Sequence, residues 1–553
     1  MRLAADFPST TRDDWRALAL GVLRRSGVES DSPEAALGTG TYDGVRLAPL
    51  YDEDDLPELR APRPSHTGWD IRQRHAVPDN EAVLADLENG VTSLWLAVPV
   101  EDLARTLAGV HLDLAPVVLE AGERTAEAAE VLFQLGGPDG GRVSGNLGAG
   151  LGPVGVELAL RCAAEHPGLR AIVVDGLPYH EAGGGDAQEL GCSLATGVAH
   201  LRALTAAGMP VEAALGQLEF RYAATADQFA TIAKLRAARL LWARVAEVCG
   251  GQGVQLQHAV TSSAMMTARD PYVNMLRTTL ACFAAGVGGA DAVTVLPFDT
   301  AMGAPDAFAR RIARNTQSLL LEEAGVGRVA DPAGGAWYVE RRTADLAAQV
   351  WAWFQEIEAA GGIEAAGELV AGRIARTRAR RDDDIAHRRF PITGVSEFPN
   401  PRERPLRPAT TEGVRYARPY EELRDLADAQ PRRPRVFLAT IGPVAAHTAR
   451  ASFAANLFHA GGLETVTSGP GTDPEEIAQA FAASGAAVAC LCSTDRLYGE
   501  HATAVAQALR QAGARRIWLA GKGSYEGVDG HLYTGCDALD VLRTTFDDLG
   551  VAR

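Results

Sequence analysis

The stretch LRAIVVDG, residues 169–176, decides the fold class because it is a nearly continuous run of apolar, β-forming residues. A strand that is apolar on both faces is typical of a parallel sheet covered by helices on both sides. Seven such strands, separated by helical patterns over roughly 240 residues, favour a (β/α)8 barrel of the TIM type over an open sheet, although an eighth strand is not evident. The other six runs are residues 91–98, 115–120, 141–147, 216–222, 254–260 and 292–297.

A second alternation of strands and helices occupies the last part of the chain, residues 435–553. Five short apolar runs each precede a helical pattern, and Asp473-Pro474 is a typical helix start, with Asp as the cap and Pro at the first helical position. This pattern predicts a flavodoxin-like, doubly wound domain, in which ligands bind at the carboxyl ends of the strands. The five runs are RVFLAT (435–440), LETVTS (463–468), AVACLC (487–492), RIWLAG (516–521) and HLYTG (531–535).

The two alternating regions divide the chain into four expected parts. Residues 1–60 hold a single amphipathic stretch, Trp15 to Leu23, which is too little to form a core, so we expect an arm that packs on something else. Residues 61–390 form the expected barrel domain, and residues 391–434, rich in Pro and Arg, form a linker with at most one helix. Residues 435–553 form the flavodoxin-like domain.

The composition excludes several classes of function. A formal net charge of −17 argues against a nucleic-acid partner, because binding phosphates requires clustered Lys and Arg. No apolar run approaches the ~20 residues of a membrane span, and the first residues lack the apolar core of a secretory signal. Seven cysteines are scattered without zinc-ligand spacing, so we expect no metal site, buried thiols and a cytoplasmic location.

Long segments of the chain resemble the methylmalonyl-CoA mutase family, and together they extend over nearly the whole chain. Members of this family are acyl-CoA mutases, intramolecular transferases that use adenosylcobalamin to interconvert methylmalonyl-CoA and succinyl-CoA. The resemblance therefore implies a barrel followed by a cobalamin-binding-type domain. The segments are PLYDEDDLP (49–57), TGWDIRQRH (67–75), FATIAKLRAARLLWARV (229–245), TARDPYVNMLRTTLACFAAGVGGADAV (267–293), RRIARNTQSLLLEEAGVGRVADPAGGAWYVE (310–340) and PITGVSEFPNP (391–401).

The cobalt-binding loop implied by this resemblance is degenerate in the flavodoxin-like domain. The family holds the cobalt through the histidine of an Asp-x-His-x-x-Gly loop after the first strand, in which the carboxylate orients the imidazole. The resemblance places the aspartate at Val444 and the histidine at Ala446, while His447 lies one position late without a following glycine. We therefore expect no cobalamin on this chain and no bound metal, with His447 as the remaining candidate ligand.

Two further segments that contact the corrin in the family are also altered. Cys492-Ser493-Thr494 replaces a Ser-Ser-Leu run, and Gly521-Lys522-Gly523 replaces a pair of glycines. The second change places a charged side chain near the expected pocket for the cofactor tail.

The catalytic positions implied for the barrel are altered in the same way. The family's Gly-Tyr-His sequence, before Glu-Ala-Gly, places its tyrosine at Leu177 and its histidine at Pro178. Tyr179 and His180 restore these residue types two positions later, although a surface histidine near a subunit contact is the simpler interpretation of His180. The family's substrate-binding arginine aligns with Leu256, which cannot form a bidentate pair with a carboxylate. We therefore expect no catalytic residue in this chain.

A glycine-rich stretch, residues 145–150, overlaps the end of the apolar run at residues 141–147. We interpret it as a turn, because its spacing is not that of a dinucleotide-binding loop.

Taken with the lost residues, the resemblance implies the small, non-catalytic subunit of a heterodimeric methylmalonyl-CoA mutase. Such a chain would stabilise a large catalytic subunit that carries the adenosylcobalamin. One alternative is a self-sufficient acyl-CoA mutase with a rearranged cobalamin site that uses His447 and His180. Another is a CoA-binding regulatory module, which bulky residues along the barrel axis would argue against.

Overall fold

Eight parallel strands close into a barrel in the computed structural model of the chain, which describes residues 10–58, 61–64, 66–137, 143–408 and 413–551. This confirms the predicted TIM-type barrel. The strands follow one another in chain order around the barrel, and β10 pairs with β3 to close it. The strands are β3 (Asp70–His75), β4 (Ser93–Leu96), β5 (Val117–Leu119), β6 (Gly145–Ala149), β7 (Leu169–Asp175), β8 (Leu218–Ala224), β9 (Gln257–Thr261) and β10 (Ala292–Thr294).

The eighth strand, which the apolar runs did not reveal, is β3. Its sequence, DIRQRH, is polar because Arg72 lies inside the barrel, where its guanidinium pairs with Glu219 of β8 and donates to Ser93 of β4. A strand with charged residues on its inner face does not form the apolar run by which buried parallel strands are recognised.

Strand β6 overlaps the predicted run at residues 141–147 but continues to Ala149, through glycines that we interpreted as a turn. Gly145 has φ +130° and Gly148 has φ +73°, values that favour glycine. A Cβ atom at either position would lie 2.0 Å from a carbonyl oxygen of the neighbouring strand β5, that of Val117 or Leu119. The glycines therefore let two barrel strands approach each other closely.

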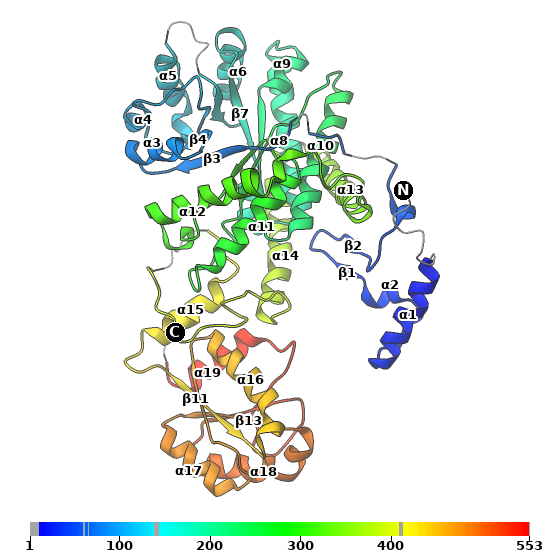
Figure 1. Cartoon of the computed structure of the whole chain (residues 1–553), viewed down its shortest axis with the longest axis vertical. Helices are drawn as coiled ribbons and strands as arrows, with labels where there is room; N and C mark the ends of the chain where they lie inside the picture. Colours follow the sequence, from blue (N-terminus) through cyan, green and yellow to red (C-terminus); the bar gives the residue numbers. More distant parts are fainter. Residues whose placement is uncertain (1–9, 59–60, 65, 138–142, 409–412, 552–553) are drawn as a thin grey trace.

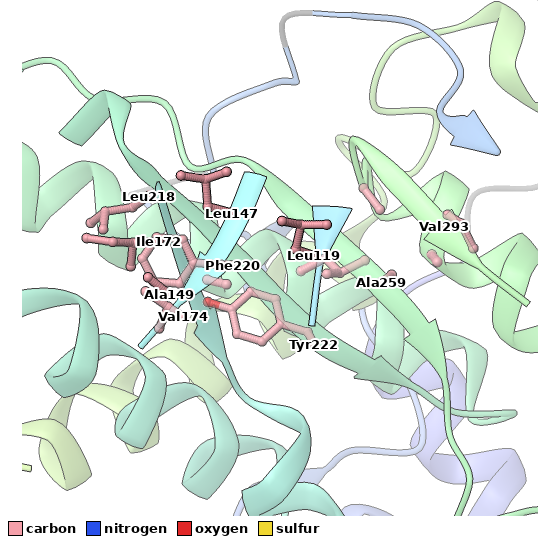
Figure 2. Packing of buried hydrophobic residues seen from close by; sticks show 14 of the residues in the cluster. Leu119, Leu147, Ala149, Ile172, Val174, Leu218, Phe220, Tyr222, Ala259 and Val293 are labelled. Carbon is pink, nitrogen blue, oxygen red and sulfur yellow. The ribbon is translucent and has the colours of Figure 1, made fainter. Parts of the chain in front are cut away.

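Helices cover the outside of the barrel, and apolar side chains on the outer faces of the strands pack beneath them (Figure 2). Phe220 of β8, for example, packs edge-on against Trp242 with ring centroids 4.6 Å apart. The helices of this part of the chain are α3 (Asn80–Glu88), α4 (Val100–Thr106), α5 (Thr125–Gly136), α6 (Pro153–Glu165), α7 (Leu177–Glu181), α8 (Asp186–Ala206), α9 (Val211–Gly216), α10 (Gln228–Val248), α11 (Val273–Val287), α12 (Ala307–Ser318), α13 (Trp337–Ala359) and α14 (Gly367–Ala386).

A five-stranded parallel sheet with the order β12-β11-β13-β14-β15 follows the barrel, as the flavodoxin-like pattern predicted. Helices α16 and α19 cover one face of this sheet, and α17 and α18 cover the other. Asp473 caps α17 with Pro474 at its first position, as predicted. The elements are β11 (Arg435–Thr440), α16 (Val444–Ala460), β12 (Glu464–Thr467), α17 (Pro474–Ser484), β13 (Val488–Cys492), α18 (Asp495–Gln511), β14 (Arg516–Ala520), β15 (Gly530–Leu532) and α19 (Ala538–Asp548).

The segment between barrel and sheet contains one helix, α15 (Arg418–Asp428), and much of it is buried. Val395 and Tyr420 are fully buried in the apolar core that α16 and α19 form on the sheet. Glu421 of α15 accepts hydrogen bonds from the backbone of the barrel domain at Ala268, 2.7 Å. Figure 1 shows α14 and α15 between the barrel and the sheet.

The N-terminal arm consists of α1 (Arg12–Arg25), α2 (Pro33–Leu37) and a hairpin of β1 (Thr39–Gly40) and β2 (Arg46–Leu47). The hairpin turn is held on the barrel, because Asp43 accepts from the backbone N–H of Ala187 at the start of α8, 2.8 Å, and Tyr42 donates to Asp384 of α14, 2.8 Å. Helix α1 lies apart from the barrel in Figure 1 and leaves Leu18 74% exposed.

The cysteines are free thiols, and all but Cys249 are buried. The expectation of buried thiols was therefore wrong for Cys249, which follows the last turn of α10. Within the described residues, no helix combines the length and apolarity that a membrane crossing requires.

Candidate functional site

A hollow of about 330 Å³ lies at the carboxyl ends of the barrel strands, where enzymes with this fold carry out their chemistry. The turn after β7 contributes Leu177, Pro178 and His180, and β4 contributes Trp95. Residues 260–263, at the end of β9, form the opposite wall. The hollow therefore brings together the positions that the resemblance assigns to catalysis in this turn.

The turn after β7 folds into the short helix α7, with the Asp175 carboxylate accepting a hydrogen bond from the Leu177 N–H, 3.0 Å. Proline at its second position has the backbone angle that a first helical turn requires. Tyr179 points away from the hollow and packs with Cys192 and Trp353. Of the two candidates, only His180 therefore faces the hollow.

His180 is buried rather than on the surface, which corrects the interpretation favoured from the sequence. Its Nε2 atom lies 2.7 Å from the Ser262 hydroxyl, and its Nδ1 atom lies 3.7 Å from a carboxylate oxygen of Glu189. Burial, reinforced by the charge of Lys234, lowers the pKa of His180 to about 3. The imidazole is therefore neutral at physiological pH.

This lowered pKa predicts a specific loss of stability in acid. Between pH 6.5 and about 3 the unfolded chain binds a proton at His180 that the folded chain does not, so stability falls as the pH falls. We expect the wild-type chain to lose about 2 kcal/mol more than His180→Gln between pH 7 and pH 5. Urea unfolding at both pH values measures this difference, and parallel pH profiles would contradict it.

An ion cluster that sequence reasoning missed lies beneath His180. Lys234 of α10 contacts Glu189 and Asp186 of α8 and donates to the backbone carbonyl of Ala223, 2.9 Å. Burial raises the pKa of Glu189 to about 7, although Lys234 opposes this shift. The available signal was Lys234 among the many apolar residues of this helix, since a lysine is almost never fully buried unless it is paired.

Side chains fill the barrel axis below the hollow. Arg221 of β8 pairs with Asp175 of β7, 3.0 Å, and its guanidinium lies 4.1 Å from the ring centroid of Trp95. His258 of β9, fully buried, lies 2.8 Å from the Thr294 hydroxyl. Trp95 also packs in an apolar cluster with residues of three other strands: Val118, Val173 and Val260.

Leu256, aligned with the family's substrate arginine, does not line the hollow. It precedes β9, and its carbonyl accepts from the backbone N–H of Phe220, 2.8 Å. Four residues of extended chain, about 13 Å, separate it from Val260 at the hollow. The structure therefore places Leu256 away from the hollow, and the loss of a substrate-binding arginine at this position stays a prediction.

At the carboxyl edge of the sheet, the loop after β11 is short, because α16 begins at Val444. Val444 is 60% exposed, and Ala446 has no group that could bind a metal. The imidazole of His447 is buried, with Nδ1 3.2 Å from the Gly442 carbonyl oxygen, so the side chain turns inward beneath its own loop.

The remainder of this edge is occupied by protein side chains. The Tyr498 hydroxyl accepts from the Ser493 N–H, 2.8 Å, and lies 3.0 Å from the Ala520 carbonyl oxygen. Arg450 of α16 donates to the Ser493 carbonyl, 2.8 Å, and stacks over Tyr498. A Cβ atom at Gly521 would lie 3.2 Å from the Arg450 guanidinium. Arg450 and Tyr498 thus fill the space over the ends of β13 and β14.

Comparison with known proteins places these features in a family. The methylmalonyl-CoA mutase family matches residues 156–452. The chain is 54% identical to the methylmalonyl-CoA mutase small subunit of Streptomyces virginiae, over 100% of this chain and 99% of that one. It is 38% identical to the small subunit from Propionibacterium freudenreichii subsp. shermanii, over 100% and 97%.

A relative named methylmalonyl-CoA mutase, from Rhizobium meliloti (strain 1021), is 36% identical over 72% of this chain and 65% of its own length. The full-length matches are to small subunits, whereas this relative matches over a part of each chain. The family match over residues 156–452 and the full-length similarity to small subunits lead to the same assignment. The chain belongs to the methylmalonyl-CoA mutase family.

Proposed function

We propose that this chain is the non-catalytic small subunit of a heterodimeric, adenosylcobalamin-dependent methylmalonyl-CoA mutase, and that it stabilises the large catalytic subunit. Full-length similarity to proteins named small subunits supports the assignment. The observation that carries the non-catalytic part is that Ala446 stands at the cobalt-ligand position while His447 turns inward toward Gly442.

The residues at the sheet edge do not fit a corrin. Ala446 offers no ligand, and Arg450 and Tyr498 fill the space over the strand ends. We therefore place the adenosylcobalamin on the large subunit.

Two other functions are less well supported. A self-sufficient mutase would need His447 to face the cofactor and His180 to exchange protons near neutral pH, whereas His447 is buried and the pKa of His180 is lowered to about 3. A CoA-binding module would need an open axis, which Arg221 and Trp95 occupy instead.

We propose the same four parts for the chain as the sequence predicted: an arm (1–60), a barrel domain (61–390), a linker (391–434) and a flavodoxin-like domain (435–553). We further propose that the complex works in the cytoplasm and that the arm contacts the large subunit. Its helix α1 carries apolar side chains that this chain leaves uncovered, Leu18 and Val22, 74% and 54% exposed.

Leu18→Asp tests this role of the arm. A charge in an apolar contact costs desolvation energy without a partner, so we expect the dissociation constant of the heterodimer to rise at least about tenfold. The affinity of the full chain for the large subunit of the same organism, measured by surface plasmon resonance, gives the result.

Leu114→Asp is the matched control, because Leu114 is 76% exposed and lies beside β5, far along the chain from the arm. We expect this variant to bind as the wild type does. Equal affinities for the two variants would remove the arm from the interface, and the absence of any complex with the wild-type chain would overturn the small-subunit proposal.

A further inference from the structure

A second, larger cavity of about 800 Å³ lies beside the hollow at the barrel mouth. Its walls come from the end of β3, helix α12, the 3-10 turn Thr300–Met302, and residues 413–415 of the linker. Strand β3, α3 and α12 pack on the same side of the barrel (Figure 1). The volume is within the range of small-molecule sites, roughly 300–1,000 Å³.

Three arginines from separate segments line this cavity: Arg74 of β3, Arg310 of α12 and Arg415 of the linker. Arg74 pairs with Glu120, 3.1 Å, and Arg415 pairs with Glu421. Arg310 donates to the carbonyl of Pro305, 3.1 Å, but within the described ranges no carboxylate lies at ion-pair distance from it. Its guanidinium therefore lacks a direct ion pair, although the Asp86 carboxylate interacts with its charge at longer range.

The two acidic residues in the lining are already engaged. Asp79 caps α3 by accepting from the Ala82 N–H, 3.0 Å, and Glu181 accepts from the Ser263 hydroxyl, 2.9 Å. Burial also raises the pKa of Glu181, which favours its neutral form. The positive charge of the arginines is therefore only partly balanced inside the cavity.

Arg415 joins the lining from the linker, where an ion pair with Glu421 holds its side chain and leaves the residue 7% exposed. Its Nε atom is buried away from the cavity, so only the terminal nitrogens of its guanidinium could contact a ligand there.

We propose that this cavity binds a small dianion, carrying phosphate or carboxylate groups, between Arg74, Arg310 and Arg415. Guanidinium groups pair with both kinds of oxyanion through two parallel hydrogen bonds, so these three side chains suit either group. The site is independent of the subunit assignment, because all three arginines belong to this chain.

Isothermal titration of the full chain with inorganic phosphate, succinate and uncharged succinamide tests the proposal. We expect at least one of the anions to bind at millimolar concentration, the succinamide not to bind, and the dissociation constant to rise with ionic strength. Binding of phosphate alone or of succinate alone identifies which oxyanion the site selects. Binding of neither anion, or equal binding of succinamide, would overturn the site.

Arg310→Gln is expected to raise the dissociation constant at least about tenfold, since it removes a charged hydrogen-bond donor. Arg311→Gln is the matched control, because Arg311 is the next residue of α12 but does not line the cavity. Arg74→Gln provides a second variant in a different segment, and circular dichroism verifies the fold of each. Equal affinity of wild type, Arg310→Gln and Arg74→Gln would place the anion elsewhere.

Discussion

Replacing Lys234 with methionine is expected to lower the free energy of unfolding by about 3–5 kcal/mol. Lys234 is buried beneath the barrel mouth and contacts the carboxylates of Glu189 and Asp186, the second at 3.1 Å. Methionine has a similar volume but no charge, so Glu189, fully buried, would lose its cation. Urea unfolding of the full chain at pH 7, followed by circular dichroism, measures the loss.

The double variant Lys234→Met, Glu189→Gln separates the ion pair from simple packing. Glutamine has no charge to leave unpaired, so we expect it to recover at least about 1 kcal/mol relative to the single variant. It also keeps an oxygen that can accept from the Ala223 N–H, as Glu189 does at 2.8 Å. A double variant less stable than Lys234→Met would contradict the account of this cluster.

Gly148→Ala is expected to destabilise the chain by at least about 3 kcal/mol. A Cβ atom at this position would lie 2.0 Å from the Leu119 carbonyl oxygen. The backbone also has φ +73°, a conformation that residues with a side chain rarely adopt. Either β6 separates from β5 or the barrel distorts, and both disturb a closed sheet. The shift in the urea midpoint of the full chain measures the effect.

Gly150→Ala is the control for this substitution. No atom lies within 4 Å of a Cβ built at Gly150, which follows the end of β6. We expect a change within about 0.5 kcal/mol. If the two variants unfolded at the same urea concentration, close strand approach would not explain the glycine at 148.

Most of the fold could be predicted from apolar runs and their alternation with helices. The pattern works where strands are apolar on both faces, as in LRAIVVDG, which became β7. It fails for β3, whose inner face carries Arg72 and Arg74, and it misplaces the end of β6, where the glycines resemble a turn. In both strands the deciding fact is a contact with another strand, Glu219 or Leu119, which lies far along the chain.

The residue types at the candidate site could be predicted from the sequence, but the positions and contacts of their side chains could not. The sequence alone shows which residue types stand at the positions of the family's functional residues: Val444, Ala446 and Pro178. The burial of His180 could not be predicted, because it depends on Ser262 and Glu189 from other elements. The inward turn of His447 likewise follows from where α16 begins.

The central claim is that this chain lacks the cofactor that its complex uses. The most direct test is the corrin absorbance of the full chain alone, of the large subunit alone and of their complex, each after incubation with adenosylcobalamin and gel filtration. We predict stoichiometric corrin on the large subunit and the complex, and none on this chain. Stoichiometric corrin on this chain alone would contradict the account and make the His447 loop a cobalamin site.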